Sequence, residues 1–201
     1  WKFWKRDSSL NNLKKLVYLI SPNKIYSNFY DDLKKVLSVK NVKFFQLRLK
    51  KEKRKKIVKI AKEIKKITKK YKVKLIINDH PKISKASNAD GCHLGQNDAS
   101  LKDLKKYLKK KIIGITCHNS KSFARIAVQN KADYLAFGSF NKSKLKPDAK
   151  RASLSILKWA KKNIKKPIVA IGGINNSNYK KFIKSGAKYI AISSYIWDNP
   201  K

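Results

Sequence analysis

Short apolar runs alternate with longer amphipathic segments along nearly the whole chain. Each apolar run is four or five residues long and rich in β-branched side chains, a composition that predicts a β-strand. The expected strands are residues 16–20, 43–47, 73–77, 91–94, 112–116, 134–138, 168–171 and 189–192. Strands that are joined by helical crossovers run parallel to one another, so the pattern predicts a parallel sheet.

The segments between the apolar runs have the spacing of amphipathic helices. In residues 51–71, Ile57, Ile60, Ala61 and Ile64 recur at helical intervals, and lysines fill most of the other positions. This pattern indicates one buried face and one solvated, basic face. The other expected helices are residues 28–38, 101–110, 120–129, 153–163 and 177–185, with one short helical turn at 81–87.

Eight strand–helix units in 201 residues predict a single α/β domain, a (β/α)8 TIM barrel near the lower end of its size range. A doubly wound open sheet is built from the same units and is the alternative, but the count of eight favours the barrel. Few residues follow the eighth strand, so we expect the final helix to be short or missing. We assign residues 1–14 to a basic helical N-terminal extension and residues 15–201 to the barrel.

The chain carries 51 basic and 12 acidic residues, a net charge of +39. Such a charge attracts nucleic acid and anionic membranes without specificity. The lysines, however, fall on the solvent faces of the expected helices, and no segment carries a known nucleic-acid-binding motif. We therefore predict no specific nucleic-acid partner and expect the field only to steer anionic small molecules.

Other compositional features point to an ordinary intracellular enzyme. No apolar run approaches the ~18 residues that a membrane span requires, and the first residues lack the pattern of a signal peptide. We therefore expect a cytoplasmic protein without a membrane partner. Cys92 and Cys117 lie in or beside apolar runs, where a buried free thiol is the usual form of cysteine. The sequence leaves association into a homo-oligomer open.

Polar residues gather directly after the expected strands, at the end of a barrel where active sites are built. They follow every strand except the first. In chain order they are Gln46, Arg48, Lys50, Asn78, Asp79, Asp98, Thr116, His118, Ser143, Lys146, Gly173, Ser193 and Ser194. We expect these residues to meet on one rim.

The acidic members of this set predict a metal site. Asp79 and Asp98 are two of only twelve acidic residues in the chain. Carboxylates in basic surroundings suit Mg²⁺, which prefers oxygen ligands and often bridges to substrate phosphates. Arg48, Lys50 and Lys146 would neutralise the same phosphates, and Arg48 can make bidentate contacts.

The last two strands predict a second anion site. Gly173 lets the backbone approach a ligand, and the amides around Ser193 and Ser194 lie at a helix N-terminus. Phosphate sites after strands seven and eight recur in TIM barrels. Gln46 and Asn78 add neutral hydrogen-bonding groups, so the rim as a whole predicts two phosphorylated ligands and Mg²⁺.

Several motifs appear at these strand ends in a specific order. They are Gln46-x-Arg48-x-Lys50, Ile77-Asn78-Asp79, Gly91-x-His93-Leu94-Gly95-Gln96-x-Asp98, Gly114-x-Thr116-x-His118-Asn119 and Ile171-Gly172-Gly173-Ile174. With them, residues 17–197 resemble the thiamine-phosphate synthase family. The resemblance implies a transferase of thiamine biosynthesis that joins 4-amino-2-methyl-5-hydroxymethylpyrimidine diphosphate to a thiazole ethyl phosphate. The products would be thiamine phosphate and diphosphate, formed through a dissociative, Mg²⁺-assisted step.

The resemblance also implies a role for each rim residue. The residues that would hold the diphosphate are Gln46, Arg48, Lys50, Asn78 and Lys146. The ligands of Mg²⁺ would be Asp79 and Asp98. Thr116 would lie near the pyrimidine and the leaving group, and it is counted with Arg48 and Lys146 as catalytic. The residues that would bind the thiazole or its phosphate are Ser143, Gly173, Ser193 and Ser194.

The chain departs from the family pattern at a few positions. Leu49 replaces the usual Glu, and Gly138-Ser139 replaces Gly-Pro before the loop after strand six. In that loop Leu145 stands where the family has a Thr, so one donor is lost. The changes concern the thiazole-phosphate end more than the metal end.

Two other functions remain alternatives. Thiazole tautomerase is a related barrel that uses a histidine at the position of His118, but it has no need of a second metal carboxylate such as Asp98. A non-catalytic, lysine-rich binding protein is the other alternative, and the altered loop after strand six is its main support.

Overall fold

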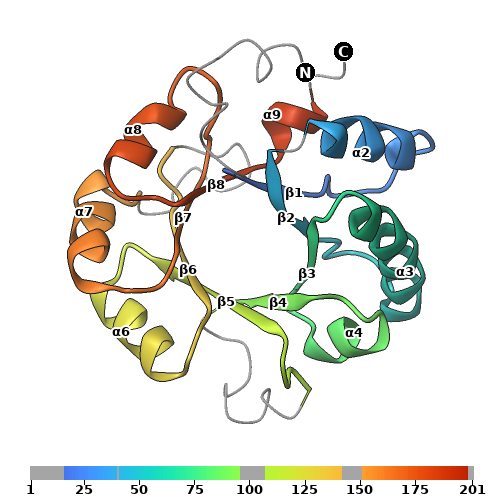
Figure 1. Ribbon diagram of the computed structural model, residues 1–201, viewed down its shortest axis with the longest axis horizontal. Coiled ribbons are helices and arrows are strands. Elements are labelled where there is room, and N and C mark those ends of the chain that lie inside the picture. The colour runs from blue at the N-terminus through green and yellow to red at the C-terminus, as the bar shows by residue number, and fades with distance from the viewer. Residues whose placement is uncertain (1–15, 40, 96–106, 142–150, 199–201) are drawn as a thin grey trace.

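In the part of the chain that the computed structural model describes, residues 16–39, 41–95, 107–141 and 151–198, eight parallel strands form a closed barrel (Figure 1). The strands are β1 (Val17–Ile20), β2 (Val42–Leu47), β3 (Lys74–Asn78), β4 (Gly91–Leu94), β5 (Ile112–His118), β6 (Tyr134–Phe137), β7 (Ile168–Ile171) and β8 (Tyr189–Ile192). Each strand pairs with its sequence neighbours, and β8 pairs with β1 to close the ring. The predicted TIM barrel is confirmed, and the open-sheet alternative is wrong.

Helices cover the outside of the barrel (Figure 1). They are α2 (Phe29–Ser38), α3 (Arg54–Lys70), α4 (Pro81–Ala86), α6 (Lys121–Gln129), α7 (Leu154–Asn163), α8 (Tyr179–Lys184) and α9 (Ser194–Trp197). The final helix is short, as the sequence predicts. The expected helix at 101–110 lies largely outside the described residues, and the expected extension at 1–14 lies wholly outside them. Within the described ranges no helix is long and apolar enough to cross a bilayer.

Each strand is buried on both faces because it separates two apolar layers. In β1, Val17 and Leu19 pack outward in the main core, which includes Phe29 of α2. Tyr18 and Ile20 point the other way and pack inside the barrel. This alternation with a period of two assigns every strand residue to the helix-facing layer or to the barrel interior.

Large aromatic rings fill the barrel interior beside small residues. Tyr18, Phe44, Tyr134 and Tyr189 all belong to this inner cluster. On the neighbouring strand β5, a Cβ atom added to Gly114 would lie 1.9 Å from the Tyr134 ring. Gly114 therefore has a packing role, since only a residue without a side chain leaves room for that ring.

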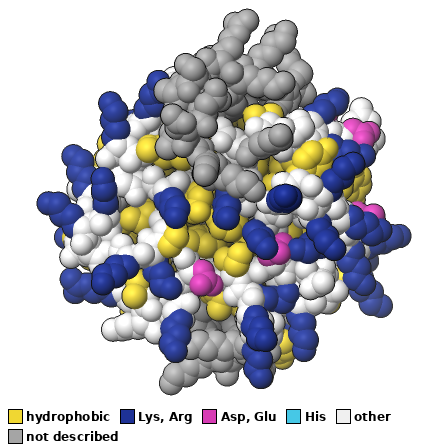
Figure 2. All heavy atoms as spheres, in the orientation of Figure 1, with side chains coloured by type: hydrophobic (Ala, Val, Ile, Leu, Met, Phe, Trp, Pro, Cys, Tyr) yellow, Lys and Arg dark blue, Asp and Glu magenta, His cyan; other side chains and the backbone are white. Residues whose placement is uncertain are grey.

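The helix surfaces carry the excess basic charge. In α3 the buried residues are Ile57, Ile60, Ala61, Ile64 and Thr68. Most of the lysines of this helix are exposed or half-buried. Figure 2 shows basic side chains spread widely over the face in view, with sparse acidic ones between them. Both cysteines are buried free thiols, as expected, and burial raises the pKa of Cys117 to about 12.

Candidate active site

The carboxyl ends of β2 to β5 bring the first group of predicted residues to one level of the barrel. The strand register pairs Gln46 with Ile76, and Asn78 with His93. His93 in turn pairs with Gly114, two residues before Thr116. Because side chains alternate along each strand, Gln46, Asn78, His93 and Thr116 all lie on the inward side near the rim.

Three of these inward-facing residues, Gln46, His93 and Thr116, form a continuous hydrogen-bond chain through the barrel interior together with Tyr18 and Tyr134. Gln46 Nε2 donates to the Tyr18 hydroxyl at 2.8 Å, and that hydroxyl lies 2.6 Å from the Tyr134 hydroxyl. The Tyr134 hydroxyl lies 3.0 Å from His93 Nδ1, and His93 Nε2 lies 2.8 Å from Thr116 Oγ1. We call these five residues the buried polar chain.

One direction of donation satisfies every group in the buried polar chain. The Tyr18 hydroxyl accepts from Gln46, so its own proton goes to Tyr134, its other recorded partner. Tyr134 then donates to His93 Nδ1, which leaves the His93 proton on Nε2 and directs it at Thr116 Oγ1. Burial raises the pKa of Tyr18 and of Tyr134 above the usual value, so both phenols stay protonated.

A carboxylate lies at the rim directly after β3. Asp79 adopts a left-handed backbone conformation with φ of 59°, and its amide donates to the His93 carbonyl at 2.8 Å. Asn78 Nδ2 donates to Asp79 Oδ2 at 2.6 Å, and Lys50 Nζ lies 4.0 Å from the same oxygen. The Asp79 side chain is 30% exposed, so the carboxylate is positioned by protein groups and still faces solvent.

The segment after β2 is tied to β1 through a serine. The Arg48 amide donates to Ser21 Oγ at 2.9 Å, and the Ser21 carbonyl accepts a hydrogen bond from Ser193 Oγ at 3.1 Å. Ser21 therefore links the carboxyl ends of β1, β2 and β8. Leu49, which replaces the family's Glu, is buried in the main core.

Two glycines after β7 form a tight turn that asparagines hold in place. Gly172 and Gly173 have φ values of 111° and 59°. Asn141 Nδ2 donates to both of their carbonyls at 3.0 Å, and Asn178 Nδ2 donates to the Gly173 carbonyl at 2.9 Å. A Cβ atom on Gly173 would lie 2.7 Å from Asn141 Cβ, so glycine is required by both backbone conformation and space.

The two serines after β8 have different surroundings. Ser193 is half-buried, and its carbonyl accepts from the amides of Ile196 and Trp197 in the first turn of α9. Ser194 is exposed at the start of the helix. By the order of strands in the barrel, β7 and β8 lie across the mouth from β3 and β4. The rim thus has a side with Asp79 and Lys50 and a facing side with Gly173 and Ser193.

Comparison with known proteins identifies the family that shares this arrangement. The family model described as thiamine monophosphate synthase matches residues 17–196. The chain belongs to this family. The membership confirms the resemblance seen in the sequence and makes the chain a transferase.

Similar proteins carry the name of the thiamine-phosphate synthase family. The thiamine-phosphate synthase of Pelagibacter ubique is 58% identical, over 94% of this chain and 91% of the relative. That of Erythrobacter litoralis is 36% identical, over 90% of this chain and 87% of the relative. A solved structure of thiamine phosphate pyrophosphorylase from Pyrococcus furiosus superposes with a TM-score of 0.80 at 28% identity, covering 90% of this chain and 87% of that one.

Three of the predicted site residues lie outside the described part of the chain: Asp98, Ser143 and Lys146. Among the described ones, the structure brings Lys50, Asn78 and Asp79 together and links Gln46 to Thr116 through the barrel interior. Arg48 follows β2 on the same rim.

Sequence reasoning did not select Tyr18, Tyr134, Ser21 or Asn141 as site residues. Tyr18 and Tyr134 each occupy a strand position where apolar residues surround them, so the pattern shows only a core aromatic residue. The available signal for Tyr134 was Gly114, a glycine inside a strand, which marks close approach of another group. Ser21 and Asn141 act through hydrogen bonds between loops, and these bonds have no local pattern in the sequence.

Proposed function

We propose that this chain catalyses the thiamine-phosphate synthase reaction at the carboxyl-end rim of the barrel. The enzyme would join the pyrimidine diphosphate to the thiazole phosphate and release diphosphate. The observation that carries this proposal is the group of Asn78, Asp79 and Lys50 at the end of β3, which lies beside the buried polar chain. Its residues supply a carboxylate, a cation and oriented neutral donors in one place.

The proposed chemistry needs charge stabilisation more than proton transfer. When the carbon–oxygen bond breaks, negative charge moves onto the departing diphosphate. Lys50 and Arg48 would stabilise that charge more strongly in the transition state than in the bound substrate. Asn78 and the second N–H of Gln46 would add neutral donors. Holding the thiazole nitrogen beside the nascent pyrimidine cation would supply the remaining advantage through proximity.

The residues at the end of β3 fit a magnesium ion. Asp79 offers a partly exposed carboxylate whose position is fixed by Asn78 and by its own amide. Mg²⁺ is commonly held by one or two carboxylates together with substrate phosphates and water. Asp79 would hold the ion, with Asp98 as the second expected ligand. A bound Mg²⁺ would neutralise the charge of the leaving diphosphate.

The buried polar chain would position Thr116. With His93 Nε2 as the donor to Thr116 Oγ1, the Thr116 hydroxyl would be fixed in orientation and would direct its own proton to a different acceptor. We infer that the pyrimidine or its leaving group is oriented through this hydroxyl. His93 would act as a positioning residue, because its ring is held between Tyr134 and Thr116.

The facing side of the rim would bind the thiazole phosphate. The Gly172–Gly173 turn brings backbone close to the mouth, and Ser193 and Ser194 begin the segment after β8. Ser143 and Lys146 are expected to complete this side. The tautomerase alternative would instead use His118, whose ring packs against Phe123 with a centroid distance of 6.5 Å. The family match and the names of the relatives favour the synthase.

The test is a product assay with both substrates and Mg²⁺. We expect diphosphate and thiamine phosphate to form in equal amounts. Asp31→Asn serves as the control, because Asp31 is an exposed carboxylate on α2 that pairs with the surface residue Lys34. If folded protein forms neither product under conditions where a known synthase does, the proposed function is wrong.

A further inference from the structure

A second group of charged residues lies at the opposite end of the barrel from the candidate active site. Lys74 begins β3, while Asp90 and Lys111 directly precede β4 and β5. With Lys65 and Lys110, these residues line a cavity of about 280 Å³. Four lysines therefore share one carboxylate, which leaves three positive charges in excess among the lining residues.

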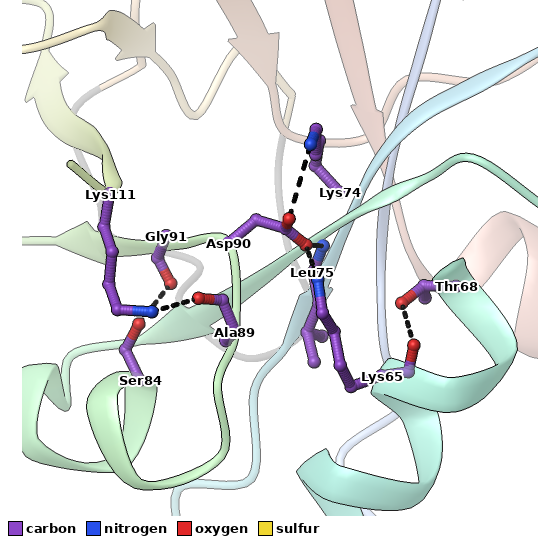
Figure 3. Close-up of polar contacts among 9 residues, drawn as sticks. All are labelled: Lys65, Thr68, Lys74, Leu75, Ser84, Ala89, Asp90, Gly91 and Lys111. Carbon is purple, nitrogen blue, oxygen red and sulfur yellow. Dashed lines mark hydrogen bonds and ion pairs between the residues drawn. The ribbon is translucent and has the colours of Figure 1, made fainter.

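Asp90 holds two of these lysines in fixed positions (Figure 3). Its Oδ2 accepts from Lys65 Nζ at 2.6 Å and from the Leu75 amide at 2.8 Å, and its Oδ1 accepts from Lys74 Nζ at 3.4 Å. The Asp90 side chain is only 16% exposed. The cluster is thus a built feature that connects α3, β3 and β4, unlike a pair of mobile surface side chains.

Lys111 extends the cluster on the other side of Asp90. Its ammonium donates to the Ala89 carbonyl, and the side chain lies alongside the loop before β4 (Figure 3). Burial lowers the pKa of Lys111, the charge of Asp90 partly offsets this effect, and the charge of Lys65 adds to it. The Lys111 ammonium is therefore less well hydrated than that of an exposed lysine, and a bound anion would compensate its charge.

We propose that this cavity binds a small phosphate-bearing anion, without Mg²⁺ and independently of the active site. A phosphate group offers several acceptor oxygens and up to two negative charges, which match ammonium groups that converge from the starts of β3 and β5 and from α3. Lysine is a common phosphate ligand that acts as a point charge. The small volume and the polar lining fit inorganic phosphate or a phosphate monoester better than an apolar ligand.

A long polyanion is the less favoured occupant. Nucleic acid would be attracted by the basic side chains that are spread widely over the face shown in Figure 2. The residues of this cluster differ from those surface lysines because two of them are fixed to one carboxylate and a third to a backbone carbonyl. Fixed donors around a cavity favour a compact ligand over an extended one.

The test is a titration of the full chain with inorganic phosphate, followed in ¹H–¹⁵N NMR spectra without Mg²⁺ and at constant ionic strength set with NaCl. We expect saturable shifts at the amides of residues 88–91 and 110–112, separate from any shifts at the carboxyl-end rim. Ribose 5-phosphate in a second titration distinguishes a monoester from free phosphate as the preferred ligand. Both results support a site for the phosphate group.

Matched lysine variants decide whether the cavity is responsible. Lys111→Gln should weaken phosphate binding about tenfold or more, the effect of losing one charge-assisted hydrogen bond. Lys109→Gln removes the same charge from a neighbouring exposed position outside the cavity, and should leave the affinity within about twofold, since exposed charges are largely screened. Spectra of both variants establish that each is folded.

Three outcomes would overturn the proposal. The first is a set of shifts that grows linearly with phosphate and never saturates. The second is an equal loss of affinity in Lys109→Gln and Lys111→Gln, which would indicate only the general field of the protein. The third is a short single-stranded oligonucleotide that shifts these amides while phosphate and ribose 5-phosphate do not.

Discussion

The two ends of the barrel each place one aspartate among lysines, but they do so in different ways. At the amino end, Lys65 Nζ lies 2.6 Å from Asp90, and the carboxylate also accepts hydrogen bonds from the Leu75 amide and from Lys74. At the carboxyl end, Lys50 Nζ lies 4.0 Å from Asp79, and the neutral amide of Asn78 donates to that carboxylate at 2.6 Å.

The difference indicates what each carboxylate does. The charge of Asp90 is neutralised by Lys65 and Lys74, so Asp90 contributes to the structure. The positive charge of the cavity exceeds that of this one carboxylate, and the excess is available to a ligand. Asp79 is held in position by Asn78, and its side chain is 30% exposed, so a cation can approach it from solvent. A carboxylate of this second kind is the better candidate for catalysis.

We expect the largest effect from removing the charge of the rim carboxylate, Asp79. Asp79→Asn keeps the shape of the side chain and removes the charge, so we expect kcat/KM to fall about a hundredfold or more while the melting temperature changes little. Steady-state release of diphosphate as a function of Mg²⁺ concentration is the measurement. An unchanged Mg²⁺ dependence would show that Asp79 is not a ligand.

The buried polar chain lies between the two ends, and removing one of its hydroxyl groups tests its contribution to stability. Tyr134→Phe leaves the Tyr18 hydroxyl and His93 Nδ1 without their partner, so we expect a loss of about 1–3 kcal/mol in the free energy of unfolding. Urea denaturation of this variant measures the loss. Tyr189→Phe is the control, because Tyr189 lies in the same inner cluster and makes no recorded hydroxyl hydrogen bond within the described residues.

A gain or no change in Tyr134→Phe would mean that the five groups are not coupled as described. Its kinetics add a second criterion. If the chain positions Thr116, the folded variant should lose kcat while KM changes less, and Tyr189→Phe should change neither.

The amino end should respond to pH. Burial opposes ionisation of Asp90, but the hydrogen bonds from Lys65 and the Leu75 amide, with the charges of Lys65 and Lys74, hold its pKa below the ordinary value of 3.8. A carboxyl with a lowered pKa in the folded state stabilises the fold above its unfolded pKa, and this stability is lost as pH falls through the folded pKa. Asp90→Asn should therefore cost about 1 kcal/mol at pH 7, because the ion pairs are partly solvated.

The same variant should match the parent protein once the pH lies below the folded pKa of Asp90. Thermal unfolding of both proteins between pH 7 and pH 3 measures the difference. A difference that is independent of pH over this range would assign the loss to the hydrogen bonds and not to the charge.

The fold could be predicted from the sequence because its signals are local. Apolar runs such as residues 168–171 and 189–192 coincide with β7 and β8. The helix predicted from the periodicity of residues 51–71 includes all of α3. The same pattern predicted the positions of site residues that lie on strands, because Gln46 and Asn78 are at the carboxyl ends of β2 and β3. Local composition was sufficient for these residues.

The contacts that complete the site could not be predicted in this way. Tyr18 and Tyr134 lie 116 positions apart in the chain, and their contact depends on the closure of the barrel. Ser21 and Ser193 are separated by 172 positions and depend on the same closure. Periodicity shows which face of a strand a side chain occupies, but it does not show which side chain it meets across the interior.

The pairing of the first strand with the last has a consequence for synthesis of the protein. Until β8 is added, β1 and β7 each expose an unpaired edge. The Ile20 carbonyl also lacks the hydrogen bond that the Trp197 indole donates in the folded protein. A chain still emerging from the ribosome therefore cannot complete its sheet, whatever its helices have already formed. We expect the cooperative transition to come only after β8 and Trp197 have been synthesised, so that protection of the intermediate by chaperones matters most before that point.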